Sequence, residues 1–221
     1  MKTLIINFKN YAEVQGEGSI ALARAAERVR GEVRARIIVA PPSPMLALTV
    51  SKVGIEVFSQ SVGIGRGEKT TGEVLPEAVL GAGAAGTILN HSEARLERRV
   101  LPDLVSRLRR LGLKTCLCAS DAREAAALSR LGPTYLAVEP PELIGSGTAV
   151  SKARPQVVAS TVAAARRAGY KGRVLCGAGI VNGDDVRRAV ELGAEGVLVS
   201  SSVVKATDWV VKLRELALSL V

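Results

Sequence analysis

Short apolar runs rich in β-branched residues alternate along the whole chain with longer stretches in which apolar residues recur at helical spacing. Apolar runs of four or five residues are typical of buried parallel strands, and apolar positions three and four residues apart are typical of amphipathic helices. We expect eight strands at 4–8, 37–40, 55–59, 86–89, 114–118, 135–138, 174–176 and 196–199. We expect helices that include 20–30, 76–82, 93–111, 122–131, 155–168, 184–192 and 208–220.

The order of these elements predicts an all-parallel sheet, because each strand is followed by a helix that can return the chain by a right-handed crossover. Eight is the number of strands that closes a (β/α)8 barrel. The 221 residues contain no linker, no low-complexity tract and no shift in composition. We therefore predict an α/β fold with one TIM-barrel domain over 1–221; an open doubly wound sheet is the alternative.

Hydropathy and cysteine content favour a soluble, cytoplasmic protein. No apolar run reaches the ~18 residues that span a bilayer, and residues 1–7 resemble a first strand more than a signal peptide. Cys116 and Cys118 are two residues apart on a predicted strand, where a disulfide is geometrically poor. With Cys176 they are interpreted as buried, reduced side chains. A metal site or reactive thiol is disfavoured because the chain has one histidine and no paired Cys/His spacing.

The net charge of +9 raises the question of a nucleic-acid partner. The 30 Lys and Arg residues are spread along the chain among 21 acidic residues, and the densest cluster, 95–110, lies on a helical pattern typical of a solvated helix face. Only 3% of the residues are aromatic, which speaks against a base-stacking surface. We expect no nucleic-acid partner, and a positive field that suits a small anionic substrate.

Arginine is abundant, whereas Asn, Gln, Met and Phe are few. This composition hints at a thermophilic source. We expect a thermal midpoint above about 60 °C.

The segment 81–86 matches the glycine pattern G-x-G-x-x-G. In dinucleotide-binding proteins this pattern follows a strand and opens a helix. Here it follows a predicted helix and precedes a strand, so we interpret it as a helix end and a tight turn. We expect no nicotinamide cofactor.

Polar residues and glycines gather directly after the predicted strands. In a parallel barrel the carboxyl ends of the strands form one rim, where active sites lie. Each of these residues has an ordinary structural explanation by itself, but on one rim they form a candidate site. They are Asn7, Lys9 and Asn10 after the first strand, Gln60 and Ser61 after the third, 90–93 after the fourth, 139–147 after the sixth, 177–179 after the seventh and 200–202 after the eighth.

His91 and Glu139 are the candidates for acid–base chemistry. His91 precedes Ser92, a good helix N-cap, and Glu93, where a helical pattern begins. The positive end of a helix dipole disfavours imidazolium, so we expect a neutral His91 that donates a hydrogen bond to a carbonyl oxygen. Glu139 follows an apolar strand and opens the proline- and glycine-rich segment 139–147. We expect a carboxylate base beside a lid that excludes water.

The glycines after the sixth and seventh strands and the serines after the eighth expose backbone N–H groups. Such groups cradle phosphate, which often sits at the seventh and eighth loops of a barrel. The sequence therefore predicts a phosphorylated substrate.

Four strand-end motifs resemble triosephosphate isomerase in its short archaeal form: Asn-Phe-Lys at 7–9, Asn-His-Ser-Glu at 90–93, 138–147 and 176–180. The similarity runs in order from Met1 to about Asp208. It implies interconversion of dihydroxyacetone phosphate and D-glyceraldehyde 3-phosphate in glycolysis and gluconeogenesis, with no cofactor and no metal.

The resemblance also implies roles for individual residues. Glu139 is expected to be the base, His91 the electrophile and Lys9 the positive charge, with Asn7 a hydrogen-bond donor and Glu93 orienting Lys9. The phosphate is expected to lie against Ile144, Gly145, Gly177, Gly179, Ser200 and Ser201. Ser200 and Ser201 stand where the common bacterial and eukaryotic form has paired glycines, so the contacts there are expected from backbone.

The segment 71–73 resembles the tip of a loop that docks into a neighbouring subunit. The resemblance thus implies a homo-oligomer, a tetramer by preference or else a dimer. Two alternatives to the main hypothesis stay open: another phosphate-binding barrel, such as an indole- or histidine-pathway enzyme, and a basic nucleic-acid-binding protein.

Overall fold

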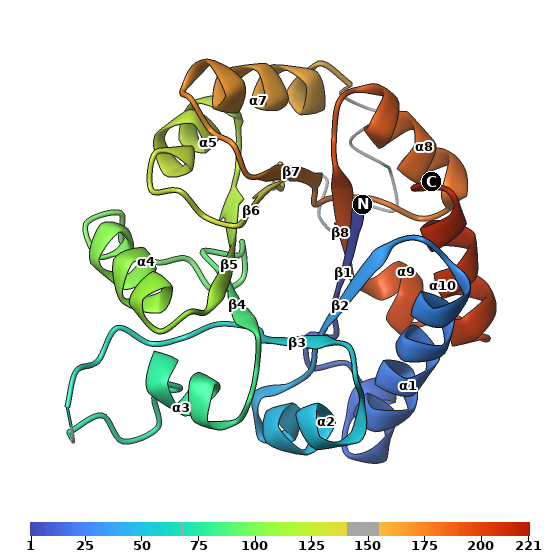
Figure 1. Cartoon of the computed structure of the whole chain (residues 1–221), viewed down its shortest axis with the longest axis horizontal. Helices are drawn as coiled ribbons and strands as arrows, with labels where there is room; N and C mark the ends of the chain where they lie inside the picture. Colours follow the sequence, from blue (N-terminus) through green and yellow to red (C-terminus); the bar gives the residue numbers. More distant parts are fainter. Residues whose placement is uncertain (68, 141–154) are drawn as a thin grey trace.

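The computed structural model describes residues 1–67, 69–140 and 155–221, and they form a closed barrel of parallel strands surrounded by helices (Figure 1). Each strand pairs with the next along the chain, and the last pairs with the first, Thr3 against Gly196. This closure confirms the TIM barrel and excludes the open sheet. The strands are β1 (Thr3–Asn7), β2 (Arg36–Ala40), β3 (Glu56–Ser59), β4 (Gly86–Leu89), β5 (Lys114–Ala119), β6 (Tyr135–Val138), β7 (Arg173–Cys176) and β8 (Gly196–Val199).

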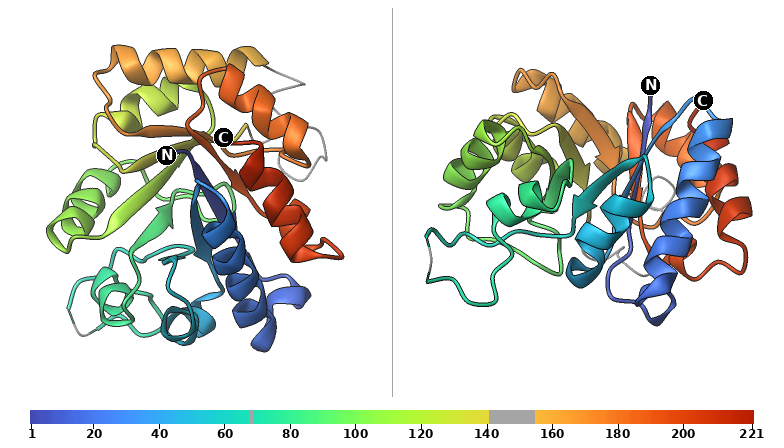
Figure 2. Two further views of the ribbon diagram at one scale, coloured as in Figure 1. Left: turned by 45° about the vertical axis from the view of Figure 1, so that its right-hand side comes forward. Right: turned by 60° about the horizontal axis from the view of Figure 1, so that its bottom comes forward.

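Helices connect successive strands and cover the outside of the barrel (Figures 1 and 2). Along the described residues they are the 3-10 helices η1 (Ala12–Val14) and η2 (Ser43–Met45) and the α-helices α1 (Glu17–Glu32), α2 (Leu46–Lys52), α3 (Pro76–Gly81), α4 (Leu101–Arg110), α5 (Ala122–Ser129), α7 (Pro155–Arg167), α8 (Gly183–Glu191), α9 (Ser201–Val204) and α10 (Trp209–Leu218). Within the part of the chain that the structure describes, no helix combines the length and apolar character needed to cross a membrane.

The predicted helix over 93–111 is wrong in its first half. Helix α4 begins only at Leu101, and residues 92–100 form turns and irregular backbone. Pro102 explains the boundary: proline lacks an N–H and is tolerated in the first turn of a helix but not in its interior. The segment 81–86 is, as predicted, a helix end and a turn, because α3 ends at Gly81 and Gly83 has a φ of +78°.

Alternate residues of the strands build two apolar layers. One set fills the barrel interior and includes Ile5, Phe58, Ile88 and Leu175. The other set, which includes Leu4 and Ile6, belongs to the larger cluster that reaches the helices. Cys116 and Cys118 belong to the interior set, Cys176 to the outer one, and all three are buried and free, which confirms the interpretation of the cysteines.

A polar cluster links the strands at their amino ends. Arg36 donates from Nη1 to the hydroxyl of the fully buried Tyr135 (3.1 Å), and Lys114 Nζ lies 2.6 Å from Glu56 Oε1. Arg36 also lies 3.8 Å from Glu56. These residues are the first of β2, β3, β5 and β6. The cluster therefore ties neighbouring strands together at the end of the barrel where catalytic sites do not lie.

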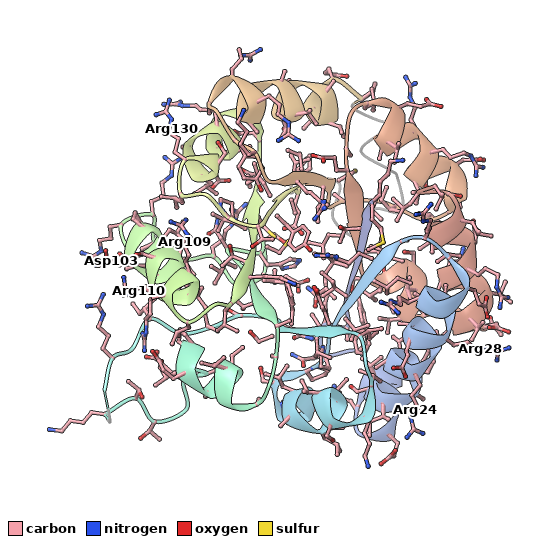
Figure 3. The ribbon with its side chains drawn as sticks, in the orientation of Figure 1. Arg24, Arg28, Asp103, Arg109, Arg110 and Arg130 are labelled. Carbon is pink, nitrogen blue, oxygen red and sulfur yellow. The ribbon has the colours of Figure 1, made fainter. Side chains whose placement is uncertain are left out.

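Much of the positive charge lies outside the ring of helices. Arg24 and Arg28 of α1, Arg110 of α4 and Arg130 point outward from it (Figure 3), whereas Arg109 donates to the Gly132 carbonyl (3.2 Å). This arrangement is that of the solvated helix faces expected from the sequence.

Candidate active site

A cavity of about 330 Å³ opens at the carboxyl ends of the strands. This volume is within the usual range for small-molecule sites. The cavity brings together most of the predicted site residues: Asn7, Lys9, His91, Glu139, Gly177, Gly179, Ser200 and Ser201. Asn10, Gln60, Ser61 and Glu93 line an adjoining hollow of about 430 Å³ that shares Asn7, Lys9 and His91 with the cavity. Ile144 and Gly145 lie outside the described residues.

The segment after β1 holds Lys9 in a strained backbone conformation. Its φ is +49°, in the left-handed region that residues other than glycine rarely adopt. The Lys9 N–H donates to Asn7 Oδ1 (3.0 Å), and Gln60 Nε2 donates to the Lys9 carbonyl (2.9 Å). Such strain persists only where the surroundings over-determine it, and it gathers at functional sites. The sequence alone gave no signal for this strain.

Glu93 contacts the Lys9 side chain, as the resemblance implies. The Lys9 Nζ lies 2.6 Å from Glu93 Oε1, and the lysine side chain is only 17% exposed. A charge-assisted hydrogen bond of this length restricts where the ammonium can go. The pair therefore keeps one positive charge beside the cavity.

His91 is held by backbone turns rather than by a helix N-terminus, which corrects the sequence-based expectation. The Glu93 N–H donates to His91 Nδ1 (3.2 Å). Asn90, whose φ is +57°, accepts the Leu96 N–H (3.1 Å) and donates to the Cys118 carbonyl (2.9 Å). A ring nitrogen that accepts an N–H carries no proton, so His91 is the tautomer protonated at Nε2.

The neutral state of His91 has a different cause from the expected helix dipole. Burial, together with the nearby Lys9 ammonium, lowers the pKa of the imidazole to about 4, while Glu93 opposes the shift. The residue is 7% exposed. A neutral imidazole near pH 7 can donate a hydrogen bond from Nε2 without being a strong acid.

Glu139 lies next to His91 in the same cavity, directly after β6. Its Oε1 is 3.5 Å from His91 Nε2, and the residue is 1% exposed. Burial raises the pKa of this carboxyl to about 7, although the Cys118 thiol and the Ser92 backbone N–H oppose the rise. Gly177 makes room for it: a Cβ there would lie 2.6 Å from Glu139 Cγ.

His91 and Glu139 thus have pKa values shifted in opposite directions within one cavity. A carboxylate with a pKa near the working pH suits proton abstraction, and a neutral donor beside it suits a carbonyl oxygen. The arrangement can move a proton between carbons next to a carbonyl. Among the described residues no group of three or more His, Cys, Asp and Glu side chains is placed to hold a metal ion.

The pKa of Glu139 predicts how activity depends on pH. Because a base must be deprotonated, kcat/KM should be constant above about pH 7 and fall about tenfold per pH unit below it. His91, with a pKa of about 4, should add no further step between pH 5 and 9. The check is a pH profile from 5 to 9. The phosphorylated substrate predicted from the sequence would itself ionise near pH 6 and could change kcat/KM there. Carboxyl ¹³C NMR of the substrate-free protein is free of this contribution and should show the same pKa of about 7 for Glu139. If kcat/KM and the Glu139 carboxyl ¹³C shift both stayed constant down to pH 5, the raised pKa of Glu139 would be contradicted.

Beyond Gly177, which lies against Glu139, the cavity is lined by an end consisting of 178–181 after β7 and 200–202 after β8. Gly179 has a φ of +70°, so this turn requires glycine. The Ser200 and Ser202 hydroxyls are buried and find no hydrogen-bond partner within residues 1–67, 69–140 and 155–221, while Ser201 is exposed. This end offers hydroxyls and backbone to a ligand group that accepts hydrogen bonds.

Two lining residues were missed from the sequence. Tyr11 and Lys205 border the cavity, and the Lys205 Nζ lies 4.9 Å from the centre of the Tyr11 ring. Both come a few residues beyond strand ends, four after β1 and six after β8. Extending the search from the first residues after each strand by one further turn would have found them.

Comparisons with known proteins agree with this geometry. The family model described as triosephosphate isomerase matches residues 2–217. The chain is 45% identical over 218 residues to the triosephosphate isomerase of Caldivirga maquilingensis, which covers 99% of this chain and 97% of that protein. It is 48% identical to that of Methanopyrus kandleri (93% and 92% covered) and 45% identical to that of Pyrobaculum arsenaticum (97% and 96% covered).

Proposed function

The chain belongs to the triosephosphate isomerase family, and from this premise we propose how its residues carry out the isomerisation. The reaction is the interconversion of dihydroxyacetone phosphate and D-glyceraldehyde 3-phosphate, a step of glycolysis; we extend it to gluconeogenesis. The observation that carries the proposal is the pair of Glu139 and His91, 3.5 Å apart in one cavity with opposite pKa shifts.

Glu139 is the general base. Its carboxylate removes a proton from C1 of dihydroxyacetone phosphate, and the electron pair of that C–H bond forms the C1–C2 double bond of an enediolate. The protonated Glu139 then returns a proton to C2, which gives the aldehyde product. Its position supports this role, because a desolvated carboxylate is a stronger base than one in water.

His91 and Lys9 stabilise the charge that develops on oxygen. The Nε2–H of His91 donates to the carbonyl oxygen and moves protons between the two enediolate oxygens. The Lys9 ammonium, held by Glu93, offsets the negative charge, and Asn7 adds a hydrogen bond. Donors that are already oriented in a water-poor cavity stabilise such charge without reorganisation.

The phosphate lies at the other end of the cavity. We place it beside Gly177, whose own N–H donates to the Val138 carbonyl (2.9 Å), and against backbone N–H groups of Gly179, Ser200 and Ser201. Ile144 and Gly145, which lie outside the described residues, complete the proposed phosphate site. The glycine and serine positions in one cavity support this placement. The buried Ser200 hydroxyl supplies a further donor.

The direct test is a coupled isomerase assay with glyceraldehyde 3-phosphate, repeated with a phosphate-bearing enediolate analogue. Turnover that the analogue inhibits competitively is the expected result. A pure, folded protein without turnover in either direction would contradict the proposed function.

We further propose a homo-oligomer, most simply a tetramer built from dimers. Residues 60–67 and 69–75 form a loop that projects beyond the ring of helices (Figures 1 and 2). Glu73 shapes it, because its carboxylate accepts the Gly65 N–H (2.8 Å) while Thr71–Glu73 stay exposed. The hollow beside Lys9, His91 and Glu93 is the site we propose for the neighbour's loop tip.

This proposal predicts a particle of about four times 23.1 kDa by light scattering. Thr71→Arg should shift it to smaller species, because a bulky charge at the tip resists burial. Thr207→Arg, at another exposed threonine far from the loop, is the matched control. A parent chain that stays monomeric at micromolar concentration would contradict the proposal.

We also propose that the chain is one domain, acts in the cytoplasm and comes from a heat-adapted organism. Arginine-rich composition and the many ion pairs among the described residues support the last point. The expected thermal midpoint is above about 60 °C; a lower value would contradict the assignment.

A further inference from the structure

Lys205 lines the cavity, although no role for it was predicted from the sequence. It follows α9 directly, and its backbone N–H donates to the Ser201 carbonyl (3.0 Å). It lines the same cavity as Gly179 and Ser201. Its side chain is therefore within the group of residues where we place the phosphate.

Tyr11 holds the end of this side chain. The Lys205 Nζ lies 4.9 Å from the centre of the Tyr11 ring, within the ~6 Å range of a cation–π contact. The contact follows from the barrel closure, because β1 and β8 pair and their following segments meet at the rim. Tyr11 also lines the cavity, so the ammonium is held beside it.

No carboxylate in the described parts of the chain neutralises the Lys205 ammonium. The other lysine of the cavity, Lys9, is paired with Glu93 at 2.6 Å, whereas no ion pair with Lys205 occurs among the described residues. An aromatic ring attracts an ammonium without neutralising it. Lys205 is therefore a positive charge available to an anion in the cavity.

We propose that Lys205, positioned by Tyr11, binds the substrate phosphate and makes the enzyme selective for phosphorylated over unphosphorylated trioses. The inference rests on the proposed function of this cavity. At pH 7 a phosphate monoester carries a charge of about −1.5 to −2. An ammonium that is held by the Tyr11 ring and has no carboxylate partner within residues 1–67, 69–140 and 155–221 attracts such a group and leaves a neutral triose unaffected. Its effect falls on binding, because Lys205 has no hydrogen bond or ion pair with Glu139 or His91 among the described residues.

The test is Lys205→Met. We expect kcat/KM for glyceraldehyde 3-phosphate to fall about tenfold or more, as for loss of a charged hydrogen bond, mainly through KM. The dissociation constant of inorganic phosphate, measured by calorimetry, should rise by a similar factor. Turnover of glyceraldehyde, which has no phosphate, should stay within about twofold. Lys205→Arg should keep most phosphate affinity, because the charge remains.

Two variants of Tyr11 test whether the Lys205 ammonium must be positioned by the aromatic ring or acts through its charge alone. Tyr11→Leu should raise the phosphate dissociation constant in the same direction as Lys205→Met, whereas Tyr11→Phe, which keeps the ring, should not. Lys52→Met, at an exposed position at the end of α2 and four residues before the amino end of β3, is the matched control for a lost surface charge.

Two results would overturn the proposal: unchanged phosphate affinity in Lys205→Met, or equal losses with glyceraldehyde 3-phosphate and glyceraldehyde. The phosphate titration requires no catalysis. An inactive parent chain would therefore contradict the proposed function and still leave the Lys205 result decisive for phosphate binding.

Discussion

Glu139→Gln should lower kcat by about 10²–10⁴-fold, which is the usual contribution of a positioned general base. Glutamine keeps the shape of the side chain but cannot accept a proton at neutral pH. Because glutamine is no larger than glutamate, it should fit in the same space beside Gly177, and the fold should be retained. The measurement is kcat in both directions, with circular dichroism to check the fold.

Glu191→Gln, at an exposed position of α8, is the matched control and should behave as the parent. A second variant, Glu139→Asp, keeps the carboxylate but withdraws it by one carbon. The kcat of Glu139→Asp should lie between that of the parent and that of Glu139→Gln. Activity of Glu139→Gln within about twofold of the parent would show that another group removes the proton.

His91→Gln should lower kcat by about 10²–10³-fold, the effect of removing one oriented donor to a developing oxyanion. Glutamine can still donate a hydrogen bond, but it cannot pass a proton between the two enediolate oxygens. The Nε2–H that faces Glu139 is thereby lost, together with the Nδ1 that accepts the Glu93 N–H. Steady-state kinetics in both directions measure the loss.

Ser92→Ala controls for disturbance of this turn, because the Ser92 hydroxyl is buried without a hydrogen-bond partner in the described residues. It should leave kcat within a few-fold of the parent. If His91→Gln and Ser92→Ala reduced kcat equally, the loss would come from the turn and not from the imidazole.

The fold could be predicted from the sequence because barrel strands are short, apolar and regularly spaced. The predicted strands 86–89, 135–138 and 196–199 agree with β4, β6 and β8 at both ends. Helix boundaries were harder, since hydrophobic periodicity continues through turns. The apolar periodicity predicted a helix from residue 93, whereas α4 begins at Leu101, and Pro102 was the one sequence feature that marked this start.

The site could be predicted as far as residue identity and chain position determine it. Glu139 and His91 follow strands directly, so the barrel topology alone brings them together. The left-handed backbone of Lys9 and the cause of the low His91 pKa could not be predicted, because both depend on contacts between distant segments, such as Gln60 with Lys9. Tyr11 and Lys205 meet only because β1 pairs with β8.

The cluster of Arg36, Glu56, Lys114 and Tyr135 stands at the far end of the barrel from Glu139 and His91. Changes at distant sites without shared partners combine almost independently. Mutations in this cluster can therefore raise or lower the tolerance of the protein to heat while turnover stays the same. During evolution at different temperatures, substitutions at the amino ends of the strands can therefore change the stability of the protein without changing its catalytic residues.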